Sequence, residues 1–301
     1  MNAAQRMTLN SQLDGNDFLY HIGLSTEDDL AERFSDVKFV CMGGKPERMR
    51  NFANLIYDVL GRPKNCEFDT VASGDELELK DLGKAAGRYS FFKVGPVISA
   101  SHGIGAASMS VILHELLKLT HYAGCTDVTF IRVGTSGGLG IEPGTSILTE
   151  QAYTGQVEPF YTQVACGREI KYDSKAPLDV AERLRECART LGHPAMVGST
   201  LSTNDFFEEQ GRLDGALCSY KEKDKMEFIK RCHDKFGIKN MEMESACFIA
   251  MCNRANVNCA VICVTIVNRL MGDVISTSHE ELKSWEDRPQ NIVAEFIRSN
   301  A

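Results

Sequence analysis

The sequence predicts an α/β fold, a single-domain three-layer α/β/α sandwich in which helices cover both faces of a mostly parallel or mixed β-sheet. Strand-like and helical segments alternate along the chain, which is the pattern of such folds. The segment 259–267 is almost wholly apolar and rich in β-branched residues, as expected for a strand covered on both faces. A length of 301 residues favours one large domain over two small ones.

The first half of the chain begins with polar, aperiodic residues, from which we expect a loose N-terminal arm over 1–18. The apolar run 37–42 predicts a buried strand, and Pro46 is a favourable first residue for the helix that follows to about residue 60. An apolar stripe with Ile112 and Leu116 predicts a second helix. The expected segments are a polar connection over 61–87, a strand over 89–101 and this helix over 106–123.

The second half continues the alternation. Residues 128–133 predict a strand, which the glycine-rich run 134–138 is expected to break. Gly192 and Gly237 are stop signals for the helical patterns that precede them. The further segments are strands over 146–151, 196–200, 241–244 and 259–267, and helices over 177–191, 218–236 and 245–255. Residues 154–174 follow neither period.

Charge and cysteine content exclude several classes of protein. The 33 Lys and Arg against 41 Asp and Glu give a formal net charge of -8, which disfavours nucleic-acid or anionic membrane partners. The 11 cysteines include no Cys-x-x-Cys pair, and the clusters at 247–252 and 259–263 lie in apolar stretches, so we expect reduced thiols packed in a core. The longest apolar stretch is far shorter than the roughly 20 residues of a spanning helix. We therefore expect a soluble, cytoplasmic protein.

A Gly-x-Gly pattern at residues 103–108 is close to the dinucleotide-binding fingerprint, because it follows a strand and opens a helix. That fingerprint also needs an acidic residue at the end of the next strand to bind the ribose. The next strand ends in Arg132-Val133-Gly134 instead. A tight turn between strand and helix is therefore favoured over a nicotinamide site.

Two strand ends combine glycine with arginine: Gly43-Gly44 with Arg48, and Arg132 with the run 134–138. Glycine lets backbone N–H groups approach an anion closely, and arginine supplies a forked, permanently charged donor. Each element alone is more often an ordinary turn, but the charge of Arg132 needs a partner in a buried strand. Together the two elements predict a phosphate site.

Two further groups of polar residues lie at element boundaries. Glu242 and Glu244 stand before a predicted helix, where capping of the helix N-terminus is at least as good an explanation as ligand binding. Gln210 and Arg212 follow the aromatic residues 206–207. They belong either to an ordinary polar loop or to a site that binds the polar edge of a planar heterocycle against an aromatic ring.

Taken together, these residues resemble the nucleoside phosphorylase superfamily, and the Gln-x-Arg element resembles its uridine phosphorylase branch in the eukaryotic form. The resemblance runs in order from about residue 19 to the C-terminus, and it implies one nucleoside phosphorylase domain over 19–301 with a partly barrel-like sheet. The matching blocks are KFVCMGG (38–44, followed by Pro46 and Arg48), RVGTSGG (132–138), DFFEEQGRLDGA (205–216) and MEMES (241–245).

The resemblance implies reversible phosphorolysis of uridine to uracil and ribose 1-phosphate in pyrimidine salvage, with no cofactor or metal, by a homodimer whose active sites are shared between subunits. His21, which by itself counts as a surface histidine, and Arg88 would reach the neighbouring subunit's site. The implied phosphate ligands are Gly44, Arg48, Arg88, Arg132 and Thr135; the ribose ligands are His21, Met243 and Glu244; the uracil ligands are Phe206, Gln210, Arg212 and Arg269. Those expected to carry catalysis are Arg48, Arg132, Thr135, Glu244 and Arg212.

The residue types suit this chemistry. Cleavage of the glycosidic bond builds positive charge on the sugar and negative charge on the base, so phosphate and arginine side chains suffice without a protein nucleophile. Purine enzymes of the superfamily use an aspartate where this chain has Asn268-Arg269-Leu270, which disfavours purines. Phe207 stands where tyrosine is common in the family, and residues 154–172 match poorly. The alternatives are a divergent paralogue that binds nucleosides with little or no turnover, and the oxidoreductase that the missing acidic residue disfavours.

Overall fold

The computed structural model describes residues 7–13, 15–70 and 77–301. Its main sheet has the strand order β13-β12-β9-β14-β8-β3-β7-β6 and mixes parallel with antiparallel pairs. The strands are β3 (Phe39–Gly43), β6 (Phe91–Val94), β7 (Val97–Ser101), β8 (Thr129–Gly138), β9 (Ser146–Thr154), β12 (Ala195–Ser202), β13 (Ile238–Glu242) and β14 (Asn258–Asn268).

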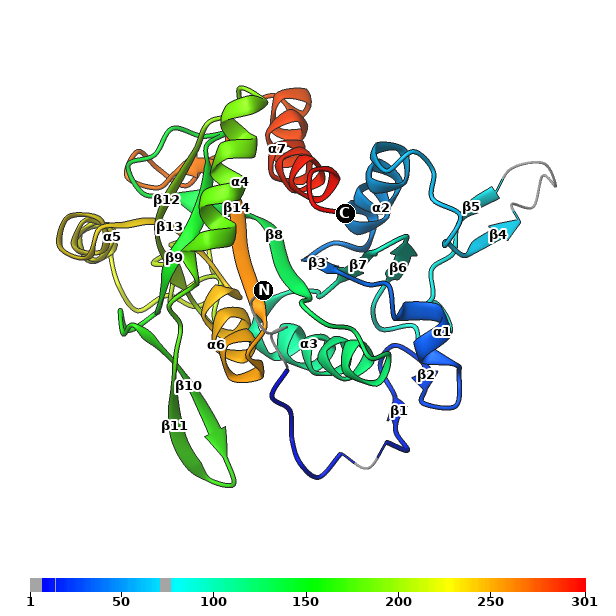
Figure 1. The fold of residues 1–301 in the computed structure, drawn as a ribbon. Helices are drawn as coiled ribbons and strands as arrows, with labels where there is room; N and C mark the ends of the chain where they lie inside the picture. The colour runs from blue at the N-terminus through cyan, green and yellow to red at the C-terminus, as the bar shows by residue number, and fades with distance from the viewer. Residues whose placement is uncertain (1–6, 14, 71–76) are drawn as a thin grey trace.

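Part of this sheet closes on itself. The far strand β13 returns to pair with β8, where Asn240 lies opposite Gly138 and Met241 opposite Gly137. Strands β8, β14, β9, β12 and β13 therefore form a small barrel, and β3, β7 and β6 extend from it as an open sheet (Figure 1). This confirms the expected mixed, partly barrel-like sheet.

Helices cover both faces of the sheet, as predicted (Figure 1). Alternate strand residues point to opposite faces, so Val40 and Phe130 pack with one set of helices, and Cys41 and Ile131 with the other. The first set is α1 (Leu30–Phe34), α3 (Gly105–Tyr122) and α6 (Ser245–Ala255); the second is α2 (Pro46–Val59), α4 (Leu178–Thr190) and α7 (His279–Arg298); α5 (Glu222–Phe236) packs on β13.

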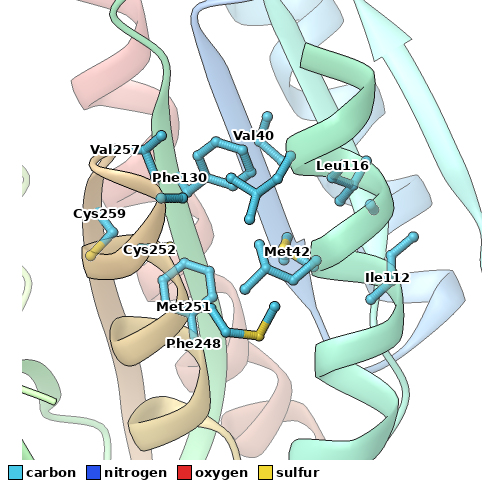
Figure 2. Packing of buried hydrophobic residues seen from close by; sticks show 14 of the residues in the cluster. Val40, Met42, Ile112, Leu116, Phe130, Phe248, Met251, Cys252, Val257 and Cys259 are labelled. Atoms are coloured by element: carbon cyan, nitrogen blue, oxygen red, sulfur yellow. The ribbon is translucent and has the colours of Figure 1, made fainter. Parts of the chain in front are cut away.

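Cysteine serves as a small apolar residue in this core. Cys252 and Cys259 are buried between α6 and the sheet with Phe248 and Met251, as Figure 2 shows. All 11 cysteines are free. The prediction that the two cysteine clusters pack in the core is confirmed.

The structure corrects several expected elements. The glycine run 134–138 does not break its strand, because β8 continues through it to Gly138. The expected strand over 89–101 is the hairpin β6–β7, which turns at Gly95 and Pro96. Neither the hairpin β10 (Phe160–Ala165) and β11 (Arg168–Asp173) nor helix α7 was predicted. Two short strand pairs were also missed, β1 (Phe18–Leu19) with β2 (Leu24–Ser25) and β4 (Phe68–Thr70) with β5 (Leu77–Leu79).

The glycines of β8 make room for neighbouring side chains and do not form turns. A Cβ at Gly137 would lie 3.0 Å from Cγ of Arg269, and a Cβ at Gly134 would lie 3.0 Å from Nη1 of Arg132. Such contacts are too close for an unshifted structure. Glycine therefore lets two arginine side chains pass over the strand.

The described part of the N-terminal arm lies against the domain. Thr8 N–H donates to the carbonyl of Ala255 at 2.8 Å, and Met7 and Leu9 pack on the core. Among the described residues, no helix is both long and apolar enough to span a membrane.

Candidate active site

The two predicted arginine elements lie next to each other. Strands β3 and β8 are parallel neighbours with Met42 opposite Arg132, so Gly43 and Gly44 follow directly beside Arg132. Arg48 lies in the first turn of α2 and pairs with Glu286 of α7 at 3.2 Å. The structure thus places both elements at one place on the sheet.

Arg132 has the partners that its burial demands. Its side chain is 4% exposed, and Nη2 donates to Glu242 at 2.9 Å and also to Glu244. Nη1 donates to Sγ of Cys263 on β14 at 2.8 Å. Burial lowers the pKa of Arg132, but Glu242, Cys263 and Glu244 outweigh this effect and raise the pKa above its ordinary value. Arg132 is therefore a permanent buried cation.

The two carboxylates have different roles. Glu242 accepts from the backbone N–H groups of Glu244 at 2.9 Å and Ser245 at 3.0 Å, so it caps the start of α6 as well as pairing with Arg132. Glu244 makes no such cap and accepts instead from the N–H of Gly105 at 2.6 Å. The capping explanation therefore holds for the first carboxylate and not for the second.

The Gly-x-Gly pattern forms a tight turn between β7 and α3, as predicted. Gly103 and Gly105 both have positive φ, at 71° and 84°. The hydroxyl of Ser108 donates to the carbonyl of His102 at 2.6 Å and tightens the turn. Because the Glu244 carboxylate occupies the Gly105 N–H, this helix N-terminus binds a protein anion.

The Gln-x-Arg loop contributes a second polar group. The Arg212 guanidinium lies 4.2 Å from the centre of the Phe206 ring, and the side chain of Gln210 is buried, with Nε2 donating to Thr203 at 3.2 Å. Burial first and the charge of Arg269 second lower the pKa of Arg212. The loop therefore presents an amide, a stacked guanidinium and a ring that is 42% exposed.

Arg269 joins the loop to the barrel. Its side chain is fully buried, and Nη2 donates to the carbonyl of Gln210 at 2.8 Å. Nη1 contacts Sδ of Met241 at 2.8 Å, and Nε pairs with Asp273. Since Met241 directly precedes Glu242, this arginine connects the loop to the Arg132 cluster through β13.

The other predicted residues divide into two groups. Thr135 lies on β8 three positions after Arg132, and Met243 lies between the two carboxylates; both are partly buried. Arg88 is exposed before β6. His21 makes contact with α3, where Nδ1 lies 2.6 Å from Glu115. Along the described chain, neither of these last two residues takes part in the contacts that join the cluster.

Reasoning from sequence missed Glu242 and Cys263 as partners of Arg132, Glu115 as the anchor of His21, and His102 beside Gly44. A signal existed for Glu115, because it lies on the apolar stripe of α3 with Ile112 and is 6% exposed. Its carboxylate accepts from the N–H groups of His21 and Ile22. In the described part of the chain, no group of three or more His, Cys, Asp or Glu forms a candidate metal site.

Comparisons with known proteins agree with this geometry. Residues 38–298 match the family model of the phosphorylase superfamily. Uridine phosphorylase 2 of Homo sapiens is 42% identical, over 94% of this chain and 86% of that protein. A protein named inactive uridine phosphorylase B, from Schistosoma mansoni, is 36% identical over 96% of this chain and 94% of that protein.

The structural comparison extends to the whole fold. A uridine phosphorylase structure from the oomycete Phytophthora capsici superposes with a TM-score of 0.88 and 39% identity, over 99% of this chain and 98% of that one. The blocks that carry the predicted resemblance lie inside the matched region, and they surround the Arg132 cluster and its neighbouring loop. The chain therefore belongs to the phosphorylase superfamily.

Proposed function

We propose that the protein is a uridine phosphorylase, a pentosyltransferase that converts uridine and phosphate reversibly to uracil and ribose 1-phosphate in pyrimidine salvage. The observation that carries the proposal is the connection of the buried Arg132 cluster to the Gln210–Arg212 loop through Arg269 and β13. Phosphate is a co-substrate, and the reaction needs no cofactor or metal. The proposed location is the cytoplasm.

The proposed phosphate site is formed by Gly44, Arg48, Arg132 and Thr135. Gly44 has no side chain, and a Cβ at this position would lie 3.2 Å from the carbonyl oxygen of Gly103, so a larger residue would crowd the turn. Arg48 and Arg132 supply positive charge for a dianion. The two glutamates around Arg132 fix its guanidinium so that little reorganisation accompanies binding.

The ribose is assigned to Met243 and Glu244. A carboxylate accepts hydrogen bonds from sugar hydroxyls, and Glu244 is oriented by Gly105 and Arg132. As the glycosidic bond breaks, positive charge builds on the sugar, and the bound phosphate offsets it while moving toward C1′. No protein nucleophile is required.

The base is assigned to Phe206, Gln210 and Arg212. The Gln210 amide matches the N3–H and a carbonyl of uracil, and Arg212 donates to the other carbonyl and stabilises the departing uracil anion. Arg269 completes the proposed uracil site, and because it donates to the Gln210 backbone carbonyl it also positions this loop.

We further propose a homodimer with shared sites, completed by His21 and Arg88 of the neighbouring subunit. His21 is anchored by Glu115, which lies ten positions after Gly105 on α3, about 15 Å along the helix axis. Glu115 thus holds His21 far from the Gly105–Glu244 contact of its own subunit, which supports a role for His21 in the site of the neighbouring subunit. Its Nδ1 faces Glu115, which leaves Nε2 for a ribose hydroxyl.

The central experiment incubates the purified protein with uridine in the presence and absence of phosphate and follows both products. We expect uracil and ribose 1-phosphate with phosphate, and no uridine loss without it. Equal rates in phosphate-free buffer would identify a hydrolase. Uracil binding without turnover would identify an inactive paralogue, in line with the name of the Schistosoma relative.

Base choice tests the loop assignment. Cytidine has no N3 proton and points an amine at Arg212, which leaves buried donors unpaired, so uridine should react about 10⁴-fold faster. Adenosine should react no faster than cytidine. A Gln210→Ala variant should lose most of this preference, and an unchanged preference would remove Gln210 from the base site.

Subunit complementation tests the shared site. Arg88→Ala and Glu244→Ala dimers should each be nearly inactive, but mixed dimers contain one site with neither change. Mixing with subunit exchange should therefore restore up to about a quarter of wild-type activity, since half the dimers are mixed and each has one intact site. No recovery despite demonstrated exchange would contradict the proposal.

A further inference from the structure

His102 has a buried imidazole ring whose two nitrogens are unpaired in the described part of the chain. It follows β7 directly, its side chain is 1% exposed, and neither Nδ1 nor Nε2 has a hydrogen-bond partner among the described residues. Buried side-chain nitrogens are nearly always hydrogen-bonded, because an unsatisfied one retains its full desolvation cost. The ring nitrogens therefore have hydrogen-bonding capacity left for a bound ligand.

The backbone holds this ring beside Gly44. His102 N–H donates to the carbonyl of Gly43 at 2.8 Å, and Gly103 N–H donates to that of Gly44 at 3.1 Å, so these bonds continue the β3–β7 pairing. The ring carbon Cε1 lies 3.9 Å from the position that a Cβ on Gly44 would take. Both ring nitrogens are bonded to Cε1, so the unpartnered edge lies at the glycine of the proposed phosphate site.

The surroundings of His102 are cationic. Burial is the main cause that holds the pKa of His102 well below its usual range, and the charges of Arg132 and Arg48 lower it further. The ring is therefore neutral, with one N–H donor and one acceptor nitrogen. Nε of Arg132 is also buried, and no described residue hydrogen-bonds to it. The free N–H groups of His102 and Arg132, together with the positive charges of Arg132 and Arg48, suit the binding of a tetrahedral oxyanion beside Gly44.

We propose that His102 is a further phosphate ligand, whose neutral ring donates an N–H hydrogen bond to an oxygen of the bound phosphate. The inference rests on the proposed function, because it takes inorganic phosphate as the anion at Gly44. A neutral donor adds a directed bond without a further charge to desolvate. The ring also completes the enclosure of the anion on the side of β7.

The test measures steady-state kinetics of the full-length protein with His102→Leu, which removes the donor and keeps an apolar volume, and with His102→Gln, which keeps a donor. His102→Leu should raise the KM for phosphate about 10- to 100-fold, as for loss of a hydrogen bond to a charged group, with less than about a threefold change in the KM for uridine. His102→Gln should recover a large part of this loss.

A matched control is Ser146→Ala on β9, which removes a different buried polar group that has no hydrogen-bond partner among the described residues. It should leave the KM for phosphate unchanged. An unchanged KM for phosphate in His102→Leu would overturn the proposal and indicate that only a buried water satisfies the ring. Equal losses in His102→Leu and His102→Gln would overturn it as well.

A second readout separates this proposal from the proposed function. Phosphate should raise the Tm of the wild-type protein, and His102→Leu should need about 10- to 100-fold more phosphate for the same increase. If uridine is not cleaved but this difference remains, the proposed function fails and the phosphate ligand stands. If the variant and the wild type respond equally to phosphate, the proposal fails whatever the activity.

Discussion

The proposed phosphate half and base half of the site are built differently. The phosphate half is centred on Arg132, which lies on a strand of the main sheet together with Thr135, and the side chains around Arg132, those of His102, Glu242 and Glu244, are buried on or just after neighbouring strands. The base half consists of Phe206, Gln210 and Arg212, which lie on an irregular loop between β12 and α5. Only the Gln210 side chain of that loop half is buried.

This difference separates two ways of positioning a charge. Arg132 is fixed by two carboxylates and a thiol inside the protein, so its removal affects the fold as well as the chemistry. Arg212 is fixed mainly by stacking on a half-exposed ring, so its removal affects chemistry with little change in stability. Four substitutions test the contrast, in order of decreasing expected effect.

The largest effect is expected for Arg132→Met. The substitution removes a proposed phosphate ligand and leaves two carboxylates buried without the guanidinium that pairs with them, so kcat/KM should fall by about 10³-fold. The free energy of unfolding should fall by about 3–5 kcal/mol. Denaturant unfolding and steady-state kinetics measure the two quantities.

The double variant Arg132→Met with Glu242→Gln is the control for this substitution. It should recover part of the stability because one buried charge is removed, and it should recover none of the activity. If Arg132→Met alone is as stable as the wild type, the phosphate half does not depend on its buried charges for stability, and the proposed contrast with the base half is wrong.

The second effect is expected for Arg212→Ala. Negative charge on the base grows toward the transition state, so kcat should fall by about 10²-fold, and more than the KM for uridine rises. The free energy of unfolding should change by less than about 1 kcal/mol. A raised KM with an unchanged kcat would assign Arg212 to ground-state binding alone.

The third effect concerns the connection between the halves. Arg269→Met removes the donor to the Gln210 carbonyl, so the loop should lose its alignment and kcat/KM for uridine should fall about 10-fold. Lys225→Met is a matched control, because Lys225 Nζ also pairs with Asp273, at 2.8 Å, whereas the described structure has no hydrogen bond between Lys225 and Gln210. If Arg269→Met and Lys225→Met lower kcat/KM equally, the alignment of the loop depends on Asp273, which both side chains bind, and not on the Gln210 contact.

The smallest effect is expected for Phe206→Leu. It removes the ring under Arg212, and an exposed cation–π contact contributes about 0.5–1 kcal/mol, so kcat/KM should fall about threefold. Phe207→Leu is the control, because the Phe207 side chain is similarly exposed and its ring packs edge-on against that of Phe206, with 5.2 Å between the ring centres. A larger loss in Phe207→Leu would reverse the assignment of the two rings.

Reasoning from sequence was most successful where one short segment carries the whole signal. The helix that begins at Pro46 and the turn at Gly103 and Gly105 follow from local rules on proline and glycine, and both are confirmed. It was wrong at Gly134–Gly138, because glycine usually marks a turn. In β8 the reason for glycine lies in side chains of Arg132 and Arg269, which local rules cannot include.

The sequence by itself determined the fold class and the superfamily, and it suggested the residue types of the proposed site, because strand and helix periods and short motifs are local in the chain. Only the tertiary structure decided which charges meet. Arg132 binds a carboxylate 112 positions later, and Gln210 is held by an arginine 59 positions later. Such partners are set by strand order and barrel closure, and each strand pairing depends on the others. The position of the His102 ring beside Gly44 therefore follows from the assembled sheet and not from the local sequence.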